Sequence, residues 1–285
     1  MCATCGCGDP KAVRVLNIGE PAANQHGHDH DHDHPHDHDH PHDHADPHSR
    51  DEHRRDAAAE STRTVAIEQA LLAKNDELAA RNRAWLAEQR ITSVNLMSSP
   101  GSGKTTLLER TIGDLAGRRD VSVIEGDQET TLDADRIRAT GCRVVQINTG
   151  AGCHLDADML ARGLHQLSPA QGSLLFVENV GNLVCPALFD LGEHARAVVI
   201  SVTEGDDKPL KYPHMFAAAD VVVINKTDLL DYVDFGVERC AANARLVNPR
   251  LEIFPVSATK GDGLDAWYDW LLRPPTSSSP HECLA

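Results

Sequence analysis

Apolar runs alternate with helical patterns from residue 92 to residue 272 of this chain. Seven of these runs are almost continuously apolar and have the length of strands. Such runs are typical of parallel strands covered by helices on both faces, because neither side of the strand meets water. We therefore predict an α/β domain with a mostly parallel sheet. The predicted strands are 93–97, 121–126, 142–148, 173–179, 197–204, 219–225 and 251–258.

The segments outside this pattern contain less that could form a core. Residues 61–90 carry apolar positions near the helical period, so we predict a leading helix for a domain of residues 61–272. Residues 9–60 are rich in His and Asp and then in other charged residues, and we expect them to be disordered without metal. Residues 1–8, MCATCGCG, hold three cysteines, and residues 273–285 form a predicted flexible tail.

Composition limits the functions that this chain can have. It has 285 residues and a formal net charge of −16, which argues against general binding to nucleic acid or to an anionic membrane. No stretch approaches the roughly 20 apolar residues of a membrane span. No secretory signal is visible, so we expect a cytoplasmic protein. Disulfides are rare in the cytoplasm, and the eight cysteines are better explained as thiols or metal ligands.

The segment SSPGSGKTTL, residues 98–107, follows the first predicted strand and opens a helix. This is the context of a phosphate-binding loop, in which backbone N–H groups and a helix N-terminus surround the phosphates. Lys104 would reach the β- and γ-phosphate oxygens, and the Thr105 hydroxyl would bind Mg²⁺. The strict pattern has glycine where this chain has Ser98. The predicted phosphate contacts are Gly101, Ser102, Gly103, Lys104, Thr105 and Thr106.

Two later motifs predict that the bound base is guanine. NKTD, residues 225–228, follows a strand, and its aspartate can accept hydrogen bonds from N1–H and the 2-amino group of guanine. Adenine offers neither donor and would leave the carboxylate unpaired. SATKG, residues 257–261, follows the next strand and would close over the base. The predicted base contacts are Asn225, Lys226, Asp228, Ser257, Ala258 and Thr259.

Two acidic residues are candidates to join Thr105 in binding Mg²⁺, which prefers oxygen ligands near phosphates. Asp127 is the first choice and Glu178 the second, because both end strands on the side where open α/β sheets bind ligands. A helix cap or a solvated loop charge is the alternative for each. Lys104 and Asp127 are the predicted catalytic residues, acting by charge neutralisation and positioning of water. No catalytic glutamine or arginine finger is recognisable, so slow turnover is expected.

Cysteine and histidine residues form two candidate metal sites. Cys2, Cys5 and Cys7 could wrap three thiolates around one soft or borderline ion. Further along the chain, Cys153, His154 and Cys185 follow predicted strands at the nucleotide end of the sheet. They could hold Zn²⁺ or Ni²⁺. A buried cysteine also behaves as a small hydrophobe, and the histidine could cap a helix, so both interpretations stay open at this point.

A third group of possible ligands is the tract from residue 26 to residue 48, in which histidine alternates mostly with aspartate. Imidazole suits nickel, copper and zinc, so we expect weak or storage sites here. A general metal buffer without a part in the chemistry is the plainer alternative. The histidines are His26, His28, His30, His32, His34, His36, His38, His40, His42, His44 and His48.

The chain resembles the hydrogenase-maturation nickel GTPases, the HypB family. The resemblance rests on the His-rich tract and on MCATCGCG, SSPGSGKTTL, EGDQETTLDADRI, GAGCHLDA, ENVGNLVCP and NKTD. It runs through residues 1–8 and from about 61 to 272, and the family's phosphate loop also begins SSPG. It implies a P-loop GTPase fold.

The resemblance also implies functions that the residues do not establish by themselves. The three N-terminal cysteines would form a high-affinity nickel site, and the Cys-His-Cys group a weaker site for nickel or zinc. GTP would promote homodimerisation. Hydrolysis would allow delivery of nickel, with a HypA-type nickel chaperone, to the precursor of the [NiFe]-hydrogenase large subunit. A urease-type nickel GTPase and a nickel storage protein are the alternatives. Lys208 and Lys211 could meet the nucleotide, a partner or only solvent.

Overall fold

The computed structural model describes residues 14–16, 49–128, 130–150, 152–182 and 184–273. Its contacts divide the chain into two units, one made of residues 1–18 and 72–285 and the other of residues 19–71. The first unit holds the sheet and every predicted site residue that the structure describes.

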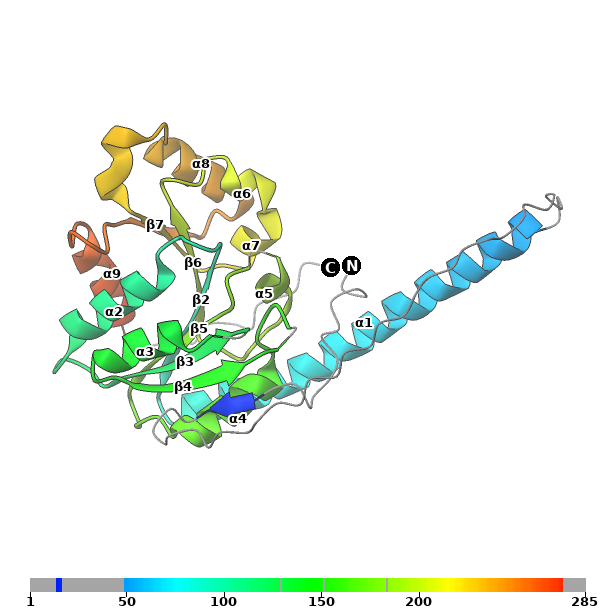
Figure 1. Cartoon of the computed structure of the whole chain (residues 1–285), viewed down its shortest axis with the longest axis horizontal. Helices are drawn as coiled ribbons and strands as arrows, with labels where there is room; N and C mark the ends of the chain where they lie inside the picture. The colour runs from blue at the N-terminus through cyan, green and yellow to red at the C-terminus, as the bar shows by residue number, and fades with distance from the viewer. Residues whose placement is uncertain (1–13, 17–48, 129, 151, 183, 274–285) are drawn as a thin grey trace, which may run out of the picture. The chain divides into compact units, whose positions relative to one another are not determined.

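Within the described residues, eight strands form one sheet in the order β1-β4-β3-β5-β2-β6-β7-β8 (Figure 1). Strands β2 to β8 run parallel to their neighbours, and each coincides with one of the seven predicted strands. Their bounds are β2 (Thr92–Ser98), β3 (Val121–Asp127), β4 (Arg143–Asn148), β5 (Leu174–Glu178), β6 (Ala195–Ser201), β7 (Val221–Asn225) and β8 (Glu252–Pro255). The predicted α/β fold with a mostly parallel sheet is therefore confirmed.

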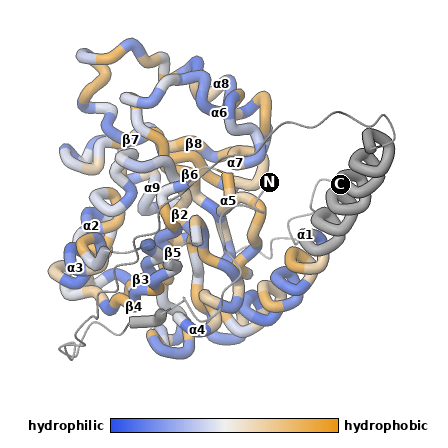
Figure 2. Tube along the Cα trace, turned by 45° about the vertical axis from the view of Figure 1, so that its right-hand side comes forward, coloured by the Kyte–Doolittle hydropathy of each residue, from blue (hydrophilic) through white to orange (hydrophobic). Residues whose placement is uncertain are grey.

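Helices cover both faces of the sheet, as the apolar runs predicted. Side chains that alternate along a strand point to opposite faces, so Val123 and Phe176 pack on one side while Ile124 and Val177 pack on the other. The first face meets α2 (Lys104–Leu115), α3 (Leu132–Ala139) and α9 (Leu264–Leu271). The second meets α4 (Ala157–Leu167), α7 (Pro213–Ala217) and α8 (Val237–Val247). Hydrophobic residues accordingly gather along the central strands (Figure 2).

The eighth strand, β1 (Arg14–Leu16), corrects the prediction that residues 9–60 are disordered throughout. It pairs antiparallel with β4, with Val15 opposite Ile147. The stretch AVRVLNI is mostly apolar and contains the β-branched residues Val13, Val15 and Ile18, which suits a strand, but it is too short to change the average composition of its segment.

The leading helix α1 (Ser49–Glu88) starts 12 residues before the predicted position, residue 61. Residues 49–60 have no apolar face, but they are rich in Ala, Arg and Glu, which have high helix propensity. From residue 72 onward the helix belongs to the unit that holds the sheet, where Leu86 packs with Leu160 and Leu164 of α4.

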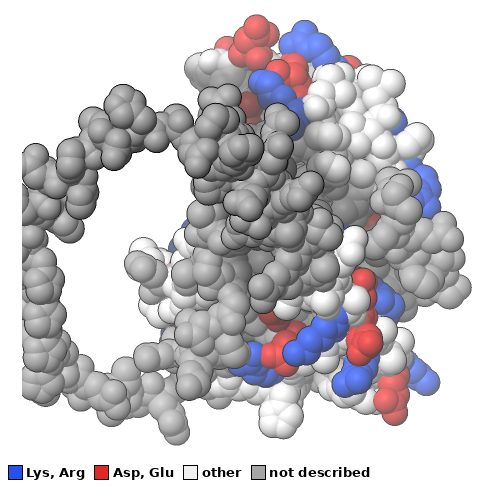
Figure 3. All heavy atoms as spheres, turned by 90° about the vertical axis from the view of Figure 1, so that its right-hand side faces the viewer, with Lys and Arg blue, Asp and Glu red and all other residues white. Residues whose placement is uncertain are grey.

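None of the helices among the described residues is long and apolar enough to cross a membrane. On the face drawn in Figure 3, acidic and basic side chains lie close together and do not separate into patches of one sign. Arg162–Asp158 and Arg239–Asp206 are two of the ion pairs among the described residues.

Candidate functional site

The phosphate loop runs from the end of β2 at Ser98 to the start of α2 at Lys104. Gly101 and Gly103 have φ angles of 77° and 87°, which side-chain-bearing residues rarely adopt. A Cβ atom on Gly103 would lie 2.6 Å from Nδ2 of Asn225. Glycine is therefore needed at this position both for the backbone turn and for contact with the base-binding motif.

Lys104 and Thr105 turn toward the end of the neighbouring strand β5. The Lys104 ammonium lies 2.8 Å from the main-chain oxygen of Asn179 and 3.4 Å from Oε1 of Glu178. The Thr105 hydroxyl donates to the same Glu178 oxygen at 2.7 Å. Burial raises the pKa of Glu178, and Lys104 and Thr105 act against that rise. The two residues expected to hold phosphate and magnesium thus share one buried carboxylate.

Asp127 lies apart from these contacts, although it was the first choice for magnesium. Its carboxylate accepts hydrogen bonds from the amide of Gln128 at 2.8 Å and from the amide and hydroxyl of Thr130 at 2.9 and 2.6 Å. These bonds tie the Asp127 carboxylate to the segment that follows β3, a role that neither alternative for this residue, a helix cap or a solvated loop charge, described. The structure therefore brings the second choice, Glu178, into contact with Lys104 and Thr105.

Glu125 is a buried acid at this end of the sheet that the sequence analysis missed. It lies opposite Glu178 in the register of β3 and β5. Burial, and then the nearby Glu178 and Asp127 carboxylates, raise the pKa of Glu125 to about 9. Oε2 of Glu125 and Oε2 of Glu178 have no hydrogen-bond partner within the described part of the chain. Glutamate ending an apolar run, two residues before Asp127, was the only available signal.

The base-binding motifs lie against the phosphate loop. Asn225, at the end of β7, donates to the main-chain oxygens of Ser102 and Gly103 at 3.0 and 3.4 Å. Its side-chain oxygen accepts from the amide of Ala258 at 3.1 Å, which joins NKTD to SATKG. Lys226 donates to the main-chain oxygen of Gly101 at 2.7 Å.

Asp228 is the second residue of the 3₁₀ helix η1 (Thr227–Tyr232). Its carboxylate accepts a hydrogen bond from the Ser257 hydroxyl at 2.6 Å. The Ser257 hydroxyl lies 3.2 Å from that of Thr259. The six predicted base-contact residues are therefore brought together. Thr106 differs from the other predicted phosphate contacts, because its hydroxyl accepts from Arg136 at 3.1 Å.

Cys153, His154 and Cys185 converge, as one of the two open interpretations required. One ligand atom from each residue lies within 4.8 Å of the others, and this is the only such group of three among the described residues. Sγ of Cys153 is 3.6 Å from Nδ1 of His154, whose ring stacks on Phe189 at 3.9 Å. Burial lowers the pKa of His154, which favours the neutral imidazole that binds metals. Histidine does not cap α4, because the cap is Asp156, which accepts from the amide of Met159.

Lys208 of α6 (Lys208–Lys211) lies beside the phosphate loop, whereas Lys211 pairs with Asp207 at the surface. The Lys208 ammonium donates to the Ser99 hydroxyl at 3.0 Å and pairs with Glu204. Several predicted ligands fall outside the described residues. They are the cysteines Cys2, Cys5 and Cys7 and the histidines from His26 to His48.

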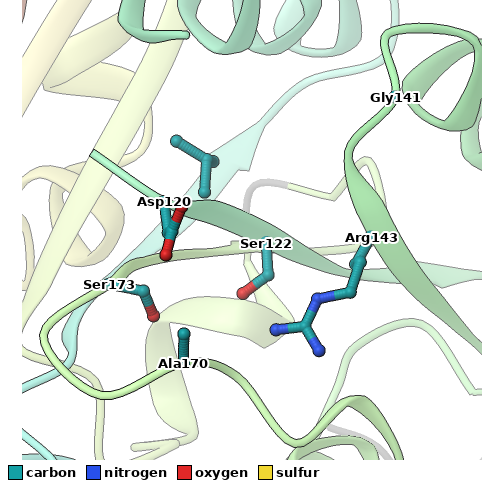
Figure 4. A pocket seen from close by; sticks show the side chains of 7 residues that line it. Asp120, Ser122, Gly141, Arg143, Ala170 and Ser173 are labelled. Carbon is teal, nitrogen blue, oxygen red and sulfur yellow. The ribbon is translucent and has the colours of Figure 1, made fainter. Parts of the chain in front are cut away.

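A cavity of about 350 Å³ lies at the amino ends of β3, β4 and β5, away from the phosphate loop (Figure 4). Asp120, Ser122, Arg143 and Ser173 line it. Arg143 donates to the main-chain oxygens of Leu167 and Ser168 at the end of α4. None of the predicted site residues borders this cavity.

Comparison with known proteins identifies the family. Residues 92–255 match the family described as the CobW/HypB/UreG nucleotide-binding domain. The hydrogenase maturation factor HypB of Rhizobium leguminosarum bv. viciae is 58% identical over 209 residues, which are 73% of this chain and 70% of that protein. This chain belongs to the HypB family of hydrogenase maturation factors.

Two solved HypB structures share its fold. HypB from Archaeoglobus fulgidus superposes with a TM-score of 0.66 at 44% identity, covering 70% of this chain and 98% of that one. The structure of HypB from Helicobacter pylori in complex with nickel superposes with a TM-score of 0.67 at 38% identity, covering 73% of this chain and 100% of that one. The nucleotide-binding domain of this family is of the P-loop GTPase type, as the motifs predicted.

Proposed function

We propose that this chain is a GTP-hydrolysing nickel metallochaperone, which delivers Ni²⁺ to the precursor of the [NiFe]-hydrogenase large subunit. The observation that carries this proposal is the convergence of Cys153, His154 and Cys185, whose ligand atoms lie within 4.8 Å of one another. A single residue, Asn179, links this group to the phosphate loop, because it accepts hydrogen bonds from Lys104 and from the amide of Leu155, the residue after His154. A nucleotide site so close to thiolate and imidazole ligands suits a protein whose metal affinity changes with its nucleotide.

The guanine nucleotide is bound by the phosphate loop and by the NKTD and SATKG motifs. Asp228 supplies a carboxylate for the base, and Asn225 holds the phosphate loop and the SATKG segment in one arrangement. Lys104 and the loop amides stabilise charge on the transferring phosphoryl group. Without a recognisable catalytic glutamine or arginine finger, the isolated protein would turn over slowly.

The donors near Thr105 suit Mg²⁺, which when bound would neutralise phosphate charge. Thr105 and Glu178 would hold it, since Oε2 of Glu178 is buried and has no partner among the described side chains. Asp127 would influence the magnesium ion indirectly, because its carboxylate is held by Gln128 and Thr130, and it would bind the ion directly only after those hydrogen bonds break. Of the two acids, we therefore assign the direct role to Glu178.

Nickel is the cargo, and Zn²⁺ is the competing ion that the same donors suit. Two thiolates and one imidazole favour these borderline divalent metals over Mg²⁺. The HypB structure from Helicobacter pylori in complex with nickel supports the choice of nickel. Cys2, Cys5 and Cys7 would form a tighter site, and the histidine tract would store nickel ahead of delivery.

Transfer would require other proteins. We propose a GTP-dependent homodimer, with a HypA-type nickel chaperone and the hydrogenase precursor as partners. Membership of a hydrogenase maturation family supports these proposed partners.

The decisive experiment compares hydrogenase activation in a deletion strain that expresses the wild-type chain, Lys104→Ala or Cys185→Ser at limiting nickel. We expect both variants to lose activation, with Lys74→Ala, an exposed lysine of α1, as the matched control. Activation that survives Lys104→Ala but not removal of residues 26–48 would favour a nickel buffer. Restoration of urease but not hydrogenase activity would favour the urease-type alternative.

A further inference from the structure

Two buried asparagines of α1, Asn75 and Asn82, bind the main chain of both segments that carry the metal ligands. They are seven positions apart, which is close to two helical turns, so they lie on the same face of the helix. Each is only 6% exposed. A buried amide is unfavourable unless its hydrogen bonds are made, so this face of α1 must meet matching polar groups.

The first segment contains Cys153 and His154 and continues into α4. Its main chain is held at Ala157, three residues after His154. The Asn75 side-chain oxygen accepts from the Ala157 amide at 3.0 Å, and the Asn82 side-chain nitrogen donates to the Ala157 oxygen at 2.8 Å.

The second segment begins with Cys185 in α5 (Cys185–Leu188) and continues to Gly192. Asn75 donates to the main-chain oxygen of Asp190 at 2.7 Å, and Asn82 donates to that of Leu191 at 3.0 Å. Each asparagine therefore bridges both segments.

Two further contacts fix α1 on the second segment. Arg83 forms hydrogen bonds of 2.8 and 2.7 Å with the two carboxylate oxygens of Asp190. Gly192 has a φ of 84°, and a Cβ atom there would clash with the main-chain oxygen of Ala79 in α1. The helix backbone thus lies directly on this segment, and no side chain separates them.

The main-chain groups that Asn75 and Asn82 bind are close in sequence to residues that contact or carry the metal ligands. Phe189, next to Asp190, stacks on the His154 ring, and Ala157 starts the helix that follows His154. The positions of Cys185 and His154 relative to each other therefore depend on how α1 holds both main chains.

We infer that Asn75 and Asn82 are positioning residues of the Cys153–His154–Cys185 site. By binding the main chain of both segments that carry the ligands, they set the separation of those segments. This inference rests on the proposed function, because it presumes that the three side chains bind nickel. Groups that orient metal ligands typically change metal affinity by 10- to 100-fold when they are removed.

The test uses the full chain with Cys2→Ser, Cys5→Ser and Cys7→Ser, so that thiolate-to-nickel charge-transfer absorption reports mainly on Cys153 and Cys185. In this background, Asn82→Ala should weaken nickel binding by about 10- to 100-fold and shift the charge-transfer band. Affinity for GDP should stay within about twofold, because the hydrogen bonds of Asn75 and Asn82 go to Ala157, Asp190 and Leu191 and not to the phosphate loop.

Leu86→Ala is the matched control, because Leu86 lies on the same helix but packs among apolar side chains. If it weakens nickel binding as much as Asn82→Ala at a similar loss of thermal stability, the asparagines only attach the helix and the inference is wrong. Should Asn82→Ala not fold, Asn75→Asp keeps the acceptor for Ala157 and loses the donor to Asp190. It should still shift the band, and an unchanged band would equally contradict the inference.

The same experiment separates this inference from the proposed function. Cys153→Ser together with Cys185→Ser in the same background should abolish the band, because both thiolates of the site are removed. If the band persists, the proposed nickel site itself is wrong. If the band disappears while Asn82→Ala binds nickel normally, the proposed nickel site is supported and the positioning role of Asn75 and Asn82 is contradicted.

Discussion

The Lys104 ammonium lies 2.8 Å from the main-chain oxygen of Asn179. The side-chain oxygen of the same asparagine accepts from the amide of Leu155 at 3.1 Å, and Leu155 follows His154 directly. Asn179 is buried and also lies in the segment that leads from Glu178 to Cys185. One residue therefore contacts the phosphate-loop lysine, adjoins the acid beside Thr105 and holds the main chain of the metal ligands.

This arrangement predicts that nucleotide and metal binding are coupled through Asn179. Nickel affinity measured with GDP and with a non-hydrolysable GTP analogue should differ by about tenfold, or about 1.4 kcal/mol. Asn179→Ala keeps the main-chain oxygen that Lys104 contacts but removes the bond to Leu155, so the difference should shrink while nucleotide affinity changes little.

Asn248→Ala is a suitable control for this measurement, since Asn248 is also buried but binds main-chain oxygens such as that of Ala219, far along the sheet order from β3 and β5. If both variants leave the nucleotide effect on nickel intact, coupling follows another route. By linkage, nickel must change the affinity for the nucleotide by the same factor, which offers an independent check.

The contact between Glu178 and Thr105 predicts which acid supports magnesium. Glu178→Gln should lower kcat for GTP hydrolysis on the order of 10²-fold, because it removes a charge beside the phosphate site. Asp127→Asn should have a smaller effect, since the Asp127 carboxylate already accepts hydrogen bonds from the amide and the hydroxyl of Thr130. Hydrolysis rates titrated with Mg²⁺ provide the measurement, and a larger loss in Asp127→Asn would restore the order of preference given by the sequence.

The sequence could not rank these two acids, for a topological reason. Both Asp127 and Glu178 end apolar strands on the same side of the sheet, so their local patterns are equivalent. The strand order decides between them: β5 pairs directly with β2, in register Leu96 to Glu178, whereas β3 is one strand further away. Strand pairing is a long-range property, and the apolar runs that located the seven strands contain no record of their order.

Other features differ in how far the sequence revealed them. NKTD and SATKG were recognisable because their side chains are fixed by the geometry of one ligand. Cys153, His154 and Cys185 could be grouped as one candidate metal site, but the metal and structural interpretations stayed open, since 31 residues between Cys153 and Cys185 must fold before the two meet. Asn75 and Asn82 gave no signal, because an asparagine in a helical pattern is ordinarily a solvent-exposed residue. The structure alone shows the carbonyl groups that they bind.

The carboxylate of Asp228 predicts strong selection of guanine over adenine, on the order of 10⁴-fold in affinity, as in sites where a missing donor leaves a polar group unpaired. Asp228→Asn should weaken GTP binding and favour xanthosine triphosphate, whose 2-oxo group can accept from the new amide. The variant keeps an oxygen for the Ser257 hydroxyl, so the fold of the motif should persist. Equal binding of GTP and ATP by the wild-type chain would contradict the assignment.

Two glycines of the phosphate loop form a matched pair for testing the link between loop and base motif. Both have positive φ angles, so alanine at either position costs about 1–2 kcal/mol of backbone strain. Only Gly103→Ala also places a Cβ atom 2.6 Å from Asn225, whereas a Cβ on Gly101 meets nothing within 4 Å. Thermal unfolding without nucleotide should therefore show a larger loss of stability for Gly103→Ala, and equal losses would show that the Asn225 contact contributes little.

The cysteines of the domain should differ in reactivity, which tests the metal site without any activity assay. Burial raises the pKa of Cys142 and of Cys240 to about 12, and only the thiolate reacts readily with iodoacetamide. At pH 8 the thiolate fraction of a thiol with such a pKa is on the order of 10⁻⁴, and below the pKa it rises about tenfold per pH unit. Cys153 and Cys185 should therefore be alkylated first, as followed by mass spectrometry of the separate peptides.

Nickel at saturating concentration should protect Cys153 and Cys185 together, because a thiolate bound to a metal is a weaker nucleophile. His154→Ala should reduce this protection by removing the third donor of the group. Cys142 and Cys240 serve as internal standards, since metal should leave their slow modification unchanged. Modification of Cys185 at the same rate with and without nickel would show that the three side chains meet without binding the ion, and the delivery role would then fall to the N-terminal cysteines.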